Sequence, residues 1–230
     1  MRLLLVALFC TIAVQANSAC RQALALGLDV SGSVDATEYR LQLDGLATAL
    51  TSPAVTQALI GDSAAPVYIL VFEWSGAADP VLVLPWTEMR DAAAIADAAL
   101  VLRTHSRGPK SPTTALGAAI ETGLAYLDQQ PNCWTQTLDI SGDGQNNDGF
   151  PPNAAYEHFD FNGITVNGLA IGGASREIED YFAAEVIHGP GAFVEYALNH
   201  DHFAEVMQRK LERELRAMIF GGEVPPPVTP

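Results

Sequence analysis

Apolar runs alternate with stretches of helical spacing along most of the chain. The continuous runs predict buried strands over 23–28, 67–72, 134–140, 164–171 and 193–197. Between and after these runs, apolar residues recur every three or four positions, which predicts helices over 35–50, 88–102, 114–127, 154–159, 176–187 and 203–219. A shorter run over 81–84 is bounded by Pro80 and Pro85. Because proline is tolerated mainly at a sheet edge, we expect this run to be an antiparallel edge strand.

This alternation determines the expected fold class. Strands that alternate with helices form a doubly wound α/β fold, an open and mostly parallel sheet covered by helices on both faces. The chain has 230 residues, of which 49% are hydrophobic, and that is enough to bury one full core. We see no internal repeat and predict a single domain over residues 20–220.

Polar residues mark the end of the first predicted strand. It runs into Asp29-Val30-Ser31-Gly32-Ser33, just before the helix that begins at Asp35. The carboxyl end of a parallel strand is where α/β sheets hold their ligands. One carboxylate and two hydroxyls form an oxygen-only set, which hard cations such as Mg²⁺ prefer. Serines in such loops also commonly cap the next helix, so this motif alone leaves both interpretations open.

Two further segments are expected at the same edge of the sheet. The strand over 134–140 ends in Ser141-Gly142-Asp143-Gly144, and Thr114 opens the preceding helix. Oxygen ligands with few negative charges suit an octahedral Mg²⁺ that keeps some water and one open position. The candidate ligands are Asp29, Ser31, Ser33, Thr114 and Asp143.

With these motifs the sequence resembles a von Willebrand factor A-like domain over roughly residues 22–218. The matching segments are Asp29-Val30-Ser31-Gly32-Ser33, Thr114-Ala115-Leu116-Gly117-Ala118-Ala119-Ile120 and Ser141-Gly142-Asp143-Gly144. In that family they form a metal-ion-dependent adhesion site, where the serines and often the threonine touch the metal and the aspartates tend to act through water. The resemblance implies these roles for the five candidate ligands. It also implies Mg²⁺, with Mn²⁺ or Ca²⁺ in substitution, and a protein partner whose Asp or Glu completes the coordination sphere.

Other segments resemble a narrower group. Glu73-Trp74, Pro85-Trp86 and the stretches SGDGQNN and NGLAIGG are similar to an uncharacterised bacterial subgroup of exported A-domain proteins, for which no activity is implied. The chain departs from the wider family before Thr114, where the usual glycines are replaced by Ser111-Pro112. That departure leaves the path of this loop open.

Enzymatic activity is the weaker interpretation. SGDGQNN also resembles the last motif of haloacid-dehalogenase-like phosphatases, but such an enzyme needs a second acid two residues after its nucleophilic aspartate. Ser31 stands at that position. A Gly-x-Ser-x-Gly nucleophile elbow is also missing. We therefore expect a binding module and no enzyme. The alternatives are a metal-dependent phosphoester hydrolase and a degenerate structural A domain without metal.

The two ends of the chain differ from its middle. Residues 1–19 have the pattern of a secretory signal peptide, with Arg2, an apolar core and small residues before Ala16 and Ala19. Cleavage fits after either alanine, and we place it after Ala19. We expect an exported protein, periplasmic or secreted, with no membrane span in the mature chain. The Pro-rich tail over 221–230 is expected to be disordered.

Cys20 and Cys133 remain after the signal peptide is removed, and two cysteines in an exported protein suggest a disulfide. Each precedes a predicted strand. If those strands are parallel neighbours, both sulfurs lie at the end of the sheet opposite the ligand site. Ala19-Cys20 also allows a lipid anchor on Cys20 as a minority alternative, which would exclude the disulfide.

Charge limits the classes of partner. The chain carries 12 positive and 27 negative residues, a net charge of -15. An acidic surface repels phosphate backbones and anionic lipids, so we expect no nucleic-acid or membrane-surface partner.

Three further sets of residues are open to interpretation. Glu73 ends the strand expected beside Asp29, so it is either a support for the site or a plain loop contact. Asp139 lies within a buried strand and needs a partner there. The three tryptophans, Trp74, Trp86 and Trp134, are expected in the core.

Overall fold

The computed structural model describes residues 20–61, 65–78, 80–108, 110–130, 132–161 and 163–221. The predicted signal peptide over 1–19 and residues 222–230 of the predicted tail lie outside this part of the chain. Within it, no helix has the length and apolar character needed to cross a membrane.

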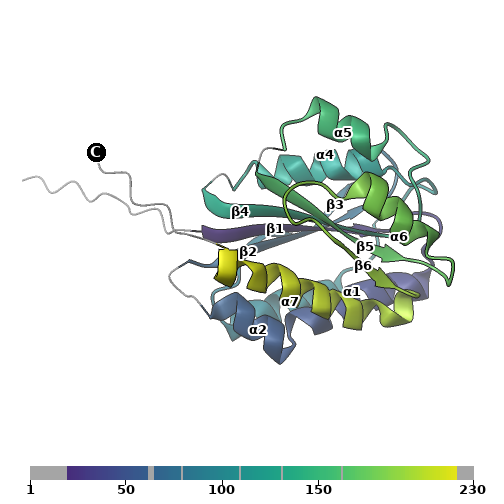
Figure 1. The fold of residues 1–230 in the computed structure, drawn as a ribbon. Coiled ribbons are helices and arrows are strands. Elements are labelled where there is room, and N and C mark those ends of the chain that lie inside the picture. Colours follow the sequence, from purple (N-terminus) through teal and green to yellow (C-terminus); the bar gives the residue numbers. More distant parts are fainter. Residues whose placement is uncertain are drawn as a thin grey trace, which may run out of the picture.

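Six strands form one sheet in the order β3-β2-β1-β4-β5-β6 (Figure 1). They are β1 (Cys20–Asp29), β2 (Val67–Trp74), β3 (Val81–Glu88), β4 (Cys133–Gly142), β5 (Ile164–Ile171) and β6 (Val194–Ala197). All neighbours pair in parallel except β2 and β3, which are antiparallel at the edge. The predicted α/β class and its antiparallel edge strand are confirmed.

Helices cover both faces of this sheet (Figure 1). One layer holds α1 (Ala36–Leu50), α2 (Pro53–Ile60), α3 (Ala92–Thr104) and α7 (Phe203–Gly221), which follows a short 3-10 turn at His200–His202. The other holds α4 (Leu116–Leu127), α5 (Pro152–His158) and a π-helical turn (Phe182–Val186) that continues α6 (Glu177–Tyr181). In the central strand β1, the three leucines face the first layer and the alanines at 23 and 25 face the second. Because both faces are covered, all of β1 is buried.

The start of α1 follows from its sequence. Asp35 accepts hydrogen bonds from the backbone N–H groups of Thr37 and Glu38, and the Glu38 carboxylate accepts one from the Asp35 N–H at 2.9 Å. This reciprocal pair is a capping box, as the spacing predicts. The capping box places the N-cap of α1 at Asp35, two residues after Ser33. The loop before α1 is therefore held by the end of β1 on one side and by the start of α1 on the other.

One helix was missed by the sequence analysis. The region around Pro53 reads as a loop, but it contains α2, whose first residue is Pro53 and whose N-cap is Ser52. Proline is favoured in the first turn of a helix, where its missing N–H costs no hydrogen bond. The Ser-Pro pair was therefore a helix start signal.

The predicted limits around Pro85 were also wrong. The edge strand β3 continues through Pro85 to Glu88, so the next helix, α3, begins only after its N-cap Asp91. The pairing of β3 with β2 shifts register between Ile69 and Val71. An edge strand can accept proline because one side has no hydrogen-bonding neighbour.

A disulfide joins Cys20 to Cys133 across a sequence separation of 113 residues. The two residues are partners in the parallel pairing of β1 with β4, and their Cα atoms lie 4.3 Å apart. Both stand at the amino ends of their strands, as the sequence analysis predicted. The bridge uses the sulfur of Cys20 that a lipid anchor would need.

Candidate metal centre

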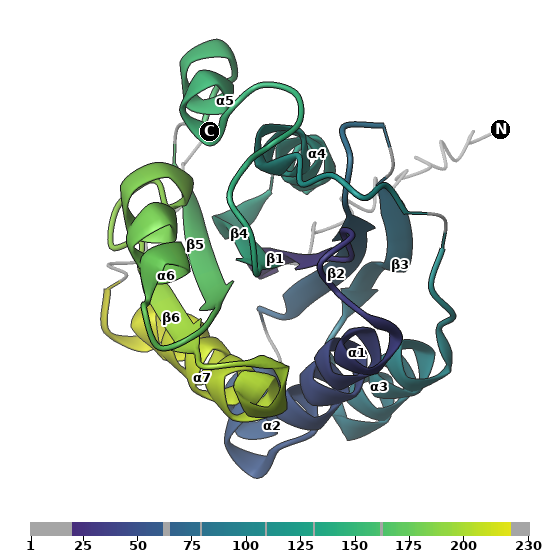
Figure 2. The ribbon, with the colours of Figure 1, turned by 90° about the vertical axis from the view of Figure 1, so that its right-hand side faces the viewer.

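The candidate ligands lie where the central strands end. β1 and β4 are parallel neighbours, and Leu28 pairs with Ser141, so the two strands finish side by side. Figure 2 looks onto this edge and shows the two strand ends at its middle, with α4 beside them. The Asp-x-Ser-x-Ser loop, which we define as residues 29–34, leaves the sheet here.

Asp29 is the last residue of β1 and only 1% of it is exposed. Its Oδ1 accepts a hydrogen bond of 2.7 Å from the backbone N–H of Ser31. Its Oδ2 is buried and has no hydrogen-bond partner. A Cβ at Gly142 would lie 3.1 Å from this oxygen, a tight contact that glycine avoids. A buried carboxylate oxygen without a partner is costly unless a cation neutralises it.

A chain of hydrogen bonds connects the serines to the second loop. The hydroxyls of Ser31 and Ser33 lie 3.2 Å apart, and the Ser33 hydroxyl donates to Asp143 Oδ1 at 2.6 Å. Ser31 is fully buried, whereas Ser33 is exposed. Four of the five candidate ligands therefore form one connected group that reaches from the interior to the surface.

Thr114 is tied to the same edge by the loop that follows β4. Its backbone N–H donates to Asn147 Oδ1 at 2.8 Å, and its carbonyl accepts from the Asn147 N–H at 2.9 Å. A Cβ at Gly144 would lie 3.5 Å from Thr114 Oγ1. The neighbouring Thr113 instead donates its hydroxyl to Asp148 at 2.8 Å. The geometry thus favours Thr114 over Thr113 as the residue beside the aspartate loop.

The electrostatics of the group fit a bound cation. Burial, together with the nearby Asp143 carboxylate, raises the pKa of Asp29 to about 7. The charged form of Asp29 therefore lacks the stabilisation that a positive charge would give. A divalent cation next to the unpartnered Oδ2 would supply it.

The donor set is rich in hydroxyls. In the part of the chain that the structure describes, no three His, Cys, Asp or Glu side chains gather into a metal-binding group. The five candidates contribute two carboxylates and three hydroxyls, with neither sulfur nor imidazole. Such a set suits a hard cation and does not suit the soft-ligand sites typical of structural zinc.

Other residues named from the sequence are not among the candidate ligands. Glu73 faces the layer of α1, on the face of the sheet opposite to Asp29, where its Oε1 accepts a 2.6 Å hydrogen bond from the Tyr39 hydroxyl. Asp139 has the partner that it requires, the buried Lys210, at 2.8 Å. Trp74 is buried as expected, but Trp134 is 55% exposed, so its predicted place in the core was wrong.

Two groups of residues at this edge were missed by the sequence analysis. Asn147 and Asp148 hold the segment before α4 through the contacts just described. Arg107 and Lys110 bind backbone carbonyls of the Asp-x-Ser-x-Ser loop. The polar run SGDGQNND was visible in the sequence as a motif. In contrast, nothing in the local sequence predicts that Arg107 contacts the backbone of Val30.

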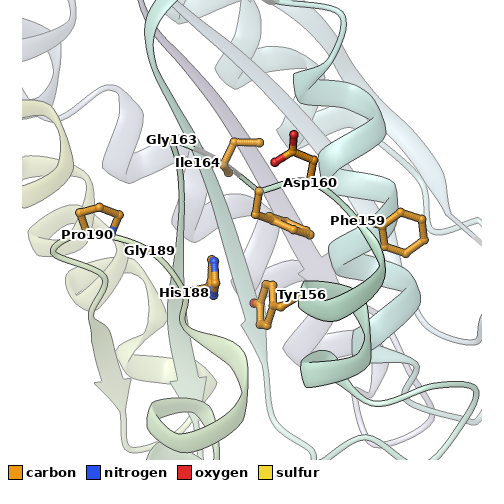
Figure 3. A pocket seen from close by; sticks show the side chains of 9 residues that line it. Tyr156, Phe159, Asp160, Gly163, Ile164, His188, Gly189 and Pro190 are labelled. Atoms are coloured by element: carbon orange, nitrogen blue, oxygen red, sulfur yellow. The ribbon is translucent and has the colours of Figure 1, made fainter.

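A pocket of about 380 Å³ lies away from this edge, beside the amino end of β5 (Figure 3). Tyr156 and His188 stack in it with ring centroids 4.3 Å apart, while Phe159 points away from them. The pocket contains none of the candidate ligands. It is therefore separate from the candidate metal centre.

Solved structures share this fold at low sequence identity. A von Willebrand factor type A protein from Catenulispora acidiphila has a TM-score of 0.58 and 17% identity over 85% of this chain and 43% of that one. Proximal thread matrix protein 1 of the mussel byssus, whose MIDAS motif is occupied by zinc, has a TM-score of 0.60 and 14% identity over 86% and 46%. The von Willebrand factor domain of the type V pili tip protein Mfa5 from Porphyromonas gingivalis has a TM-score of 0.59 and 9% identity over 90% and 99%.

The chain thus spans less than half the length of the first two structures and nearly all of the third. No match to this sequence is found among curated proteins. A family model described as "Protein of unknown function (DUF1194)" matches residues 19–219. Because the match includes most of the chain, the protein belongs to the DUF1194 family, and its fold is that of a von Willebrand factor A domain.

Proposed function

We propose that this chain is an exported module that binds a divalent cation and, through it, an acidic side chain of a protein partner. The ligands proposed are Asp29, Ser31, Ser33, Thr114 and Asp143. Mg²⁺ is the proposed ion, with Mn²⁺ or Ca²⁺ able to substitute. The observation that carries the proposal is the buried Asp29 Oδ2, which has no protein partner at the end of a hydrogen-bonded row of hydroxyls.

The proposed ligands differ in how deeply they are buried. Asp29 and Ser31 are buried and hold the inner side of the site, whereas Ser33 is exposed and Asp143 is partly exposed. Bound there, the ion would offer an open coordination position of high positive charge to a carboxylate from outside. With only two acidic ligands, the charge of the ion is not overcompensated, so an external carboxylate is still attracted.

Export is proposed on two grounds. The first 19 residues have the pattern of a signal peptide, and the Cys20–Cys133 disulfide is typical of oxidising compartments. Adhesive use is supported by the related folds, which include a pilus tip protein and a byssal thread protein. We propose no catalytic activity, because Ser31 occupies the position where a haloacid-dehalogenase-like phosphatase needs its second acid.

Calorimetric titration of Mg²⁺ and Mn²⁺ into the mature protein tests this function. We expect saturable binding that is lost in Asp29→Ala and in the isosteric Asp29→Asn, and kept in Asp97→Ala, which changes an exposed carboxylate on α3. Equal affinity in the Asp29 variants would refute the assignment. A parent protein that binds neither ion would favour the structural alternative, and metal-dependent hydrolysis of p-nitrophenyl phosphate would favour the hydrolase.

A further inference from the structure

Two positively charged side chains from the segment between α3 and α4, Arg107 and Lys110, bind the backbone of the Asp-x-Ser-x-Ser loop. Arg107 Nη2 donates to the carbonyl oxygens of Val30 at 2.8 Å and Val34 at 2.9 Å. Lys110 Nζ donates to the carbonyl oxygens of Val34 at 3.1 Å and Ser31 at 3.3 Å. Three carbonyls of a six-residue loop therefore bind two side chains more than seventy positions away in the sequence. The Val34 carbonyl binds both side chains, and the Ser31 carbonyl also accepts from the Val34 N–H at 3.2 Å.

Arg107 is itself held in place from its other side. Its guanidinium lies over the ring of Tyr39, 5.0 Å from the centroid. Tyr39 belongs to α1, is 4% exposed, and donates its hydroxyl to the fully buried Glu73. The partly buried Arg107 is therefore held between the loop carbonyls and a buried aromatic ring, which restricts its side chain.

The same connection also touches the loop through its backbone. The N–H of Gly32 donates to the Pro112 carbonyl at 3.3 Å. A Cβ at residue 32 would lie only 2.8 Å from that oxygen, so this approach requires glycine. Pro112 is one of the two residues that replace the glycines usual in similar domains. The altered segment thus packs directly on the metal-binding loop.

These contacts separate the polar groups of the loop by type. Its carbonyls bind Arg107 and Lys110, while the Ser31 hydroxyl contacts that of Ser33, which donates to Asp143. Without Arg107, the Val30 carbonyl would need another donor, and the loop could turn to find one. Loss of Lys110 removes one of the donors to the carbonyls of Ser31 and Val34 and weakens the same restraint. Arg107 and Lys110 therefore favour the one loop shape in which the Ser31 hydroxyl lies beside that of Ser33 and the Ser33 hydroxyl reaches Asp143.

We infer that Arg107 and Lys110 are positioning residues that form a clamp on the Asp-x-Ser-x-Ser loop and hold it in its ligating shape before any ion or partner binds. This inference rests on the proposed function only in its consequence, namely that loss of the clamp weakens metal binding. The clamp itself is a property of the metal-free protein.

The charge of Arg107 and Lys110 and their positioning of the loop would change metal affinity in opposite directions. A positive side chain near the site repels a divalent cation, so neutralising it would strengthen metal binding if charge alone mattered. Loss of the clamp would weaken binding, because the ligands would first have to be ordered. The sign of the change therefore identifies which effect dominates.

Hydrogen exchange in the metal-free protein tests the clamp directly. The loop amides of Val30, Ser31, Gly32 and Val34 all donate to identified acceptors, so they should exchange slowly. Lys110→Met and Arg107→Met should each speed their exchange by about tenfold, the scale expected for losing hydrogen bonds from a charged donor. Lys110→Arg, which keeps a cationic donor, should restore protection. Arg90→Met is the matched control, since that side chain is 70% exposed. Unchanged loop exchange in both clamp variants would overturn the inference.

Mg²⁺ titration of the same proteins tests the consequence. We expect affinity to fall about tenfold in Lys110→Met and to recover in Lys110→Arg. If the parent binds Mg²⁺ and the Met variants bind it equally or better, the positioning role is refuted although the metal site stands. If the parent binds no Mg²⁺, the proposed function fails, and the exchange rates alone decide whether the clamp exists.

Discussion

The hydroxyl of Ser33 donates to the carboxylate of Asp143 at 2.6 Å, and this bond joins two loops whose residues are 110 positions apart. One loop follows β1 and the other follows β4. The contact exists because these strands are parallel neighbours with ends at the same level of the sheet.

Removing the Ser33 hydroxyl tests whether this contact belongs to a metal site. We expect Ser33→Ala to lower Mg²⁺ affinity by about tenfold, or roughly 1.4 kcal/mol, because one oxygen ligand is lost. Stability should change little, since Ser33 is exposed. Ser33→Thr keeps a hydroxyl and should bind Mg²⁺ nearly as the parent does. Calorimetric titration measures both variants, and an unchanged affinity in Ser33→Ala would remove this residue from the ligand set.

Asn147 should affect the site without being a ligand. Asn147→Ala leaves the N–H of Thr114 without its acceptor, which we expect to cost about 1–2 kcal/mol of stability. Mg²⁺ affinity should fall as well, because Thr114 loses its fixed position. Gln145→Ala is a suitable control, since Gln145 is exposed in the same loop. Urea unfolding and metal titration provide the two measurements, and a drop in stability with no loss of affinity would show that Thr114 is not a ligand.

Lys210 should be essential for stability. It is fully buried between Asp139 at 2.8 Å and Glu214 at 2.7 Å, while Asn167 donates to the same Glu214 oxygen. Lys210→Met leaves two buried carboxylates without their positively charged partner, which we expect to lower the free energy of unfolding by about 3–5 kcal/mol. Arg209→Met, which loses an exposed ion pair one residue earlier, should cost under about 1 kcal/mol. Similar unfolding midpoints in urea for the two variants would contradict this view of the buried group.

The same group predicts a pH dependence. Burial raises the pKa of Asp139 to about 7, with Glu214 adding to the rise and Lys210 opposing it. Between the unfolded-state pKa of about 4 and the folded-state value, the folded chain keeps a proton that the unfolded chain releases. Stability should therefore fall as pH rises through this window, by at most about 1.4 kcal/mol per pH unit from this residue.

Asp139→Asn isolates that contribution. The pKa of Asp29 is raised in the same direction, so the metal-free parent has two groups that lower stability as pH rises. We expect the variant to show a visibly shallower slope between pH 4 and 7 in urea unfolding with chelator present. A slope as steep as that of the parent would show that Asp139 does not titrate in this range.

The parts of the fold set by local patterns were predictable. Continuous apolar runs marked the parallel strands because both faces of the sheet are buried, and Asp35 with Glu38 marked the start of α1. The limits near Pro85 were not predictable, because an edge strand can continue through a proline where a central strand cannot. The exposure of Trp134 depends on which helices cover the end of β4, and that is a tertiary property.

That the candidate ligands lie close together was predictable for a related reason. Four of the five candidate ligands follow strand ends, and the carboxyl ends of neighbouring parallel strands meet at one edge, whereas Thr114 precedes α4. The roles of Arg107 and Lys110 depend instead on contacts between side chains and distant backbone carbonyls. Every residue has a backbone carbonyl, so no residue type in the sequence shows which carbonyls accept hydrogen bonds from Arg107 and Lys110.

The place of the lysines has a practical consequence. The chain has two of them, and Lys210 is fully buried in its ion pairs, so Lys110 is the lysine amine that reagents can reach beside the α-amino group. Coupling the protein to a bead or sensor surface through lysine amines would attach it by the edge that holds the candidate site, and would hide that edge from a partner. α7 ends at the opposite edge of the sheet (Figure 1), so a tag placed after it leaves the site facing the solution.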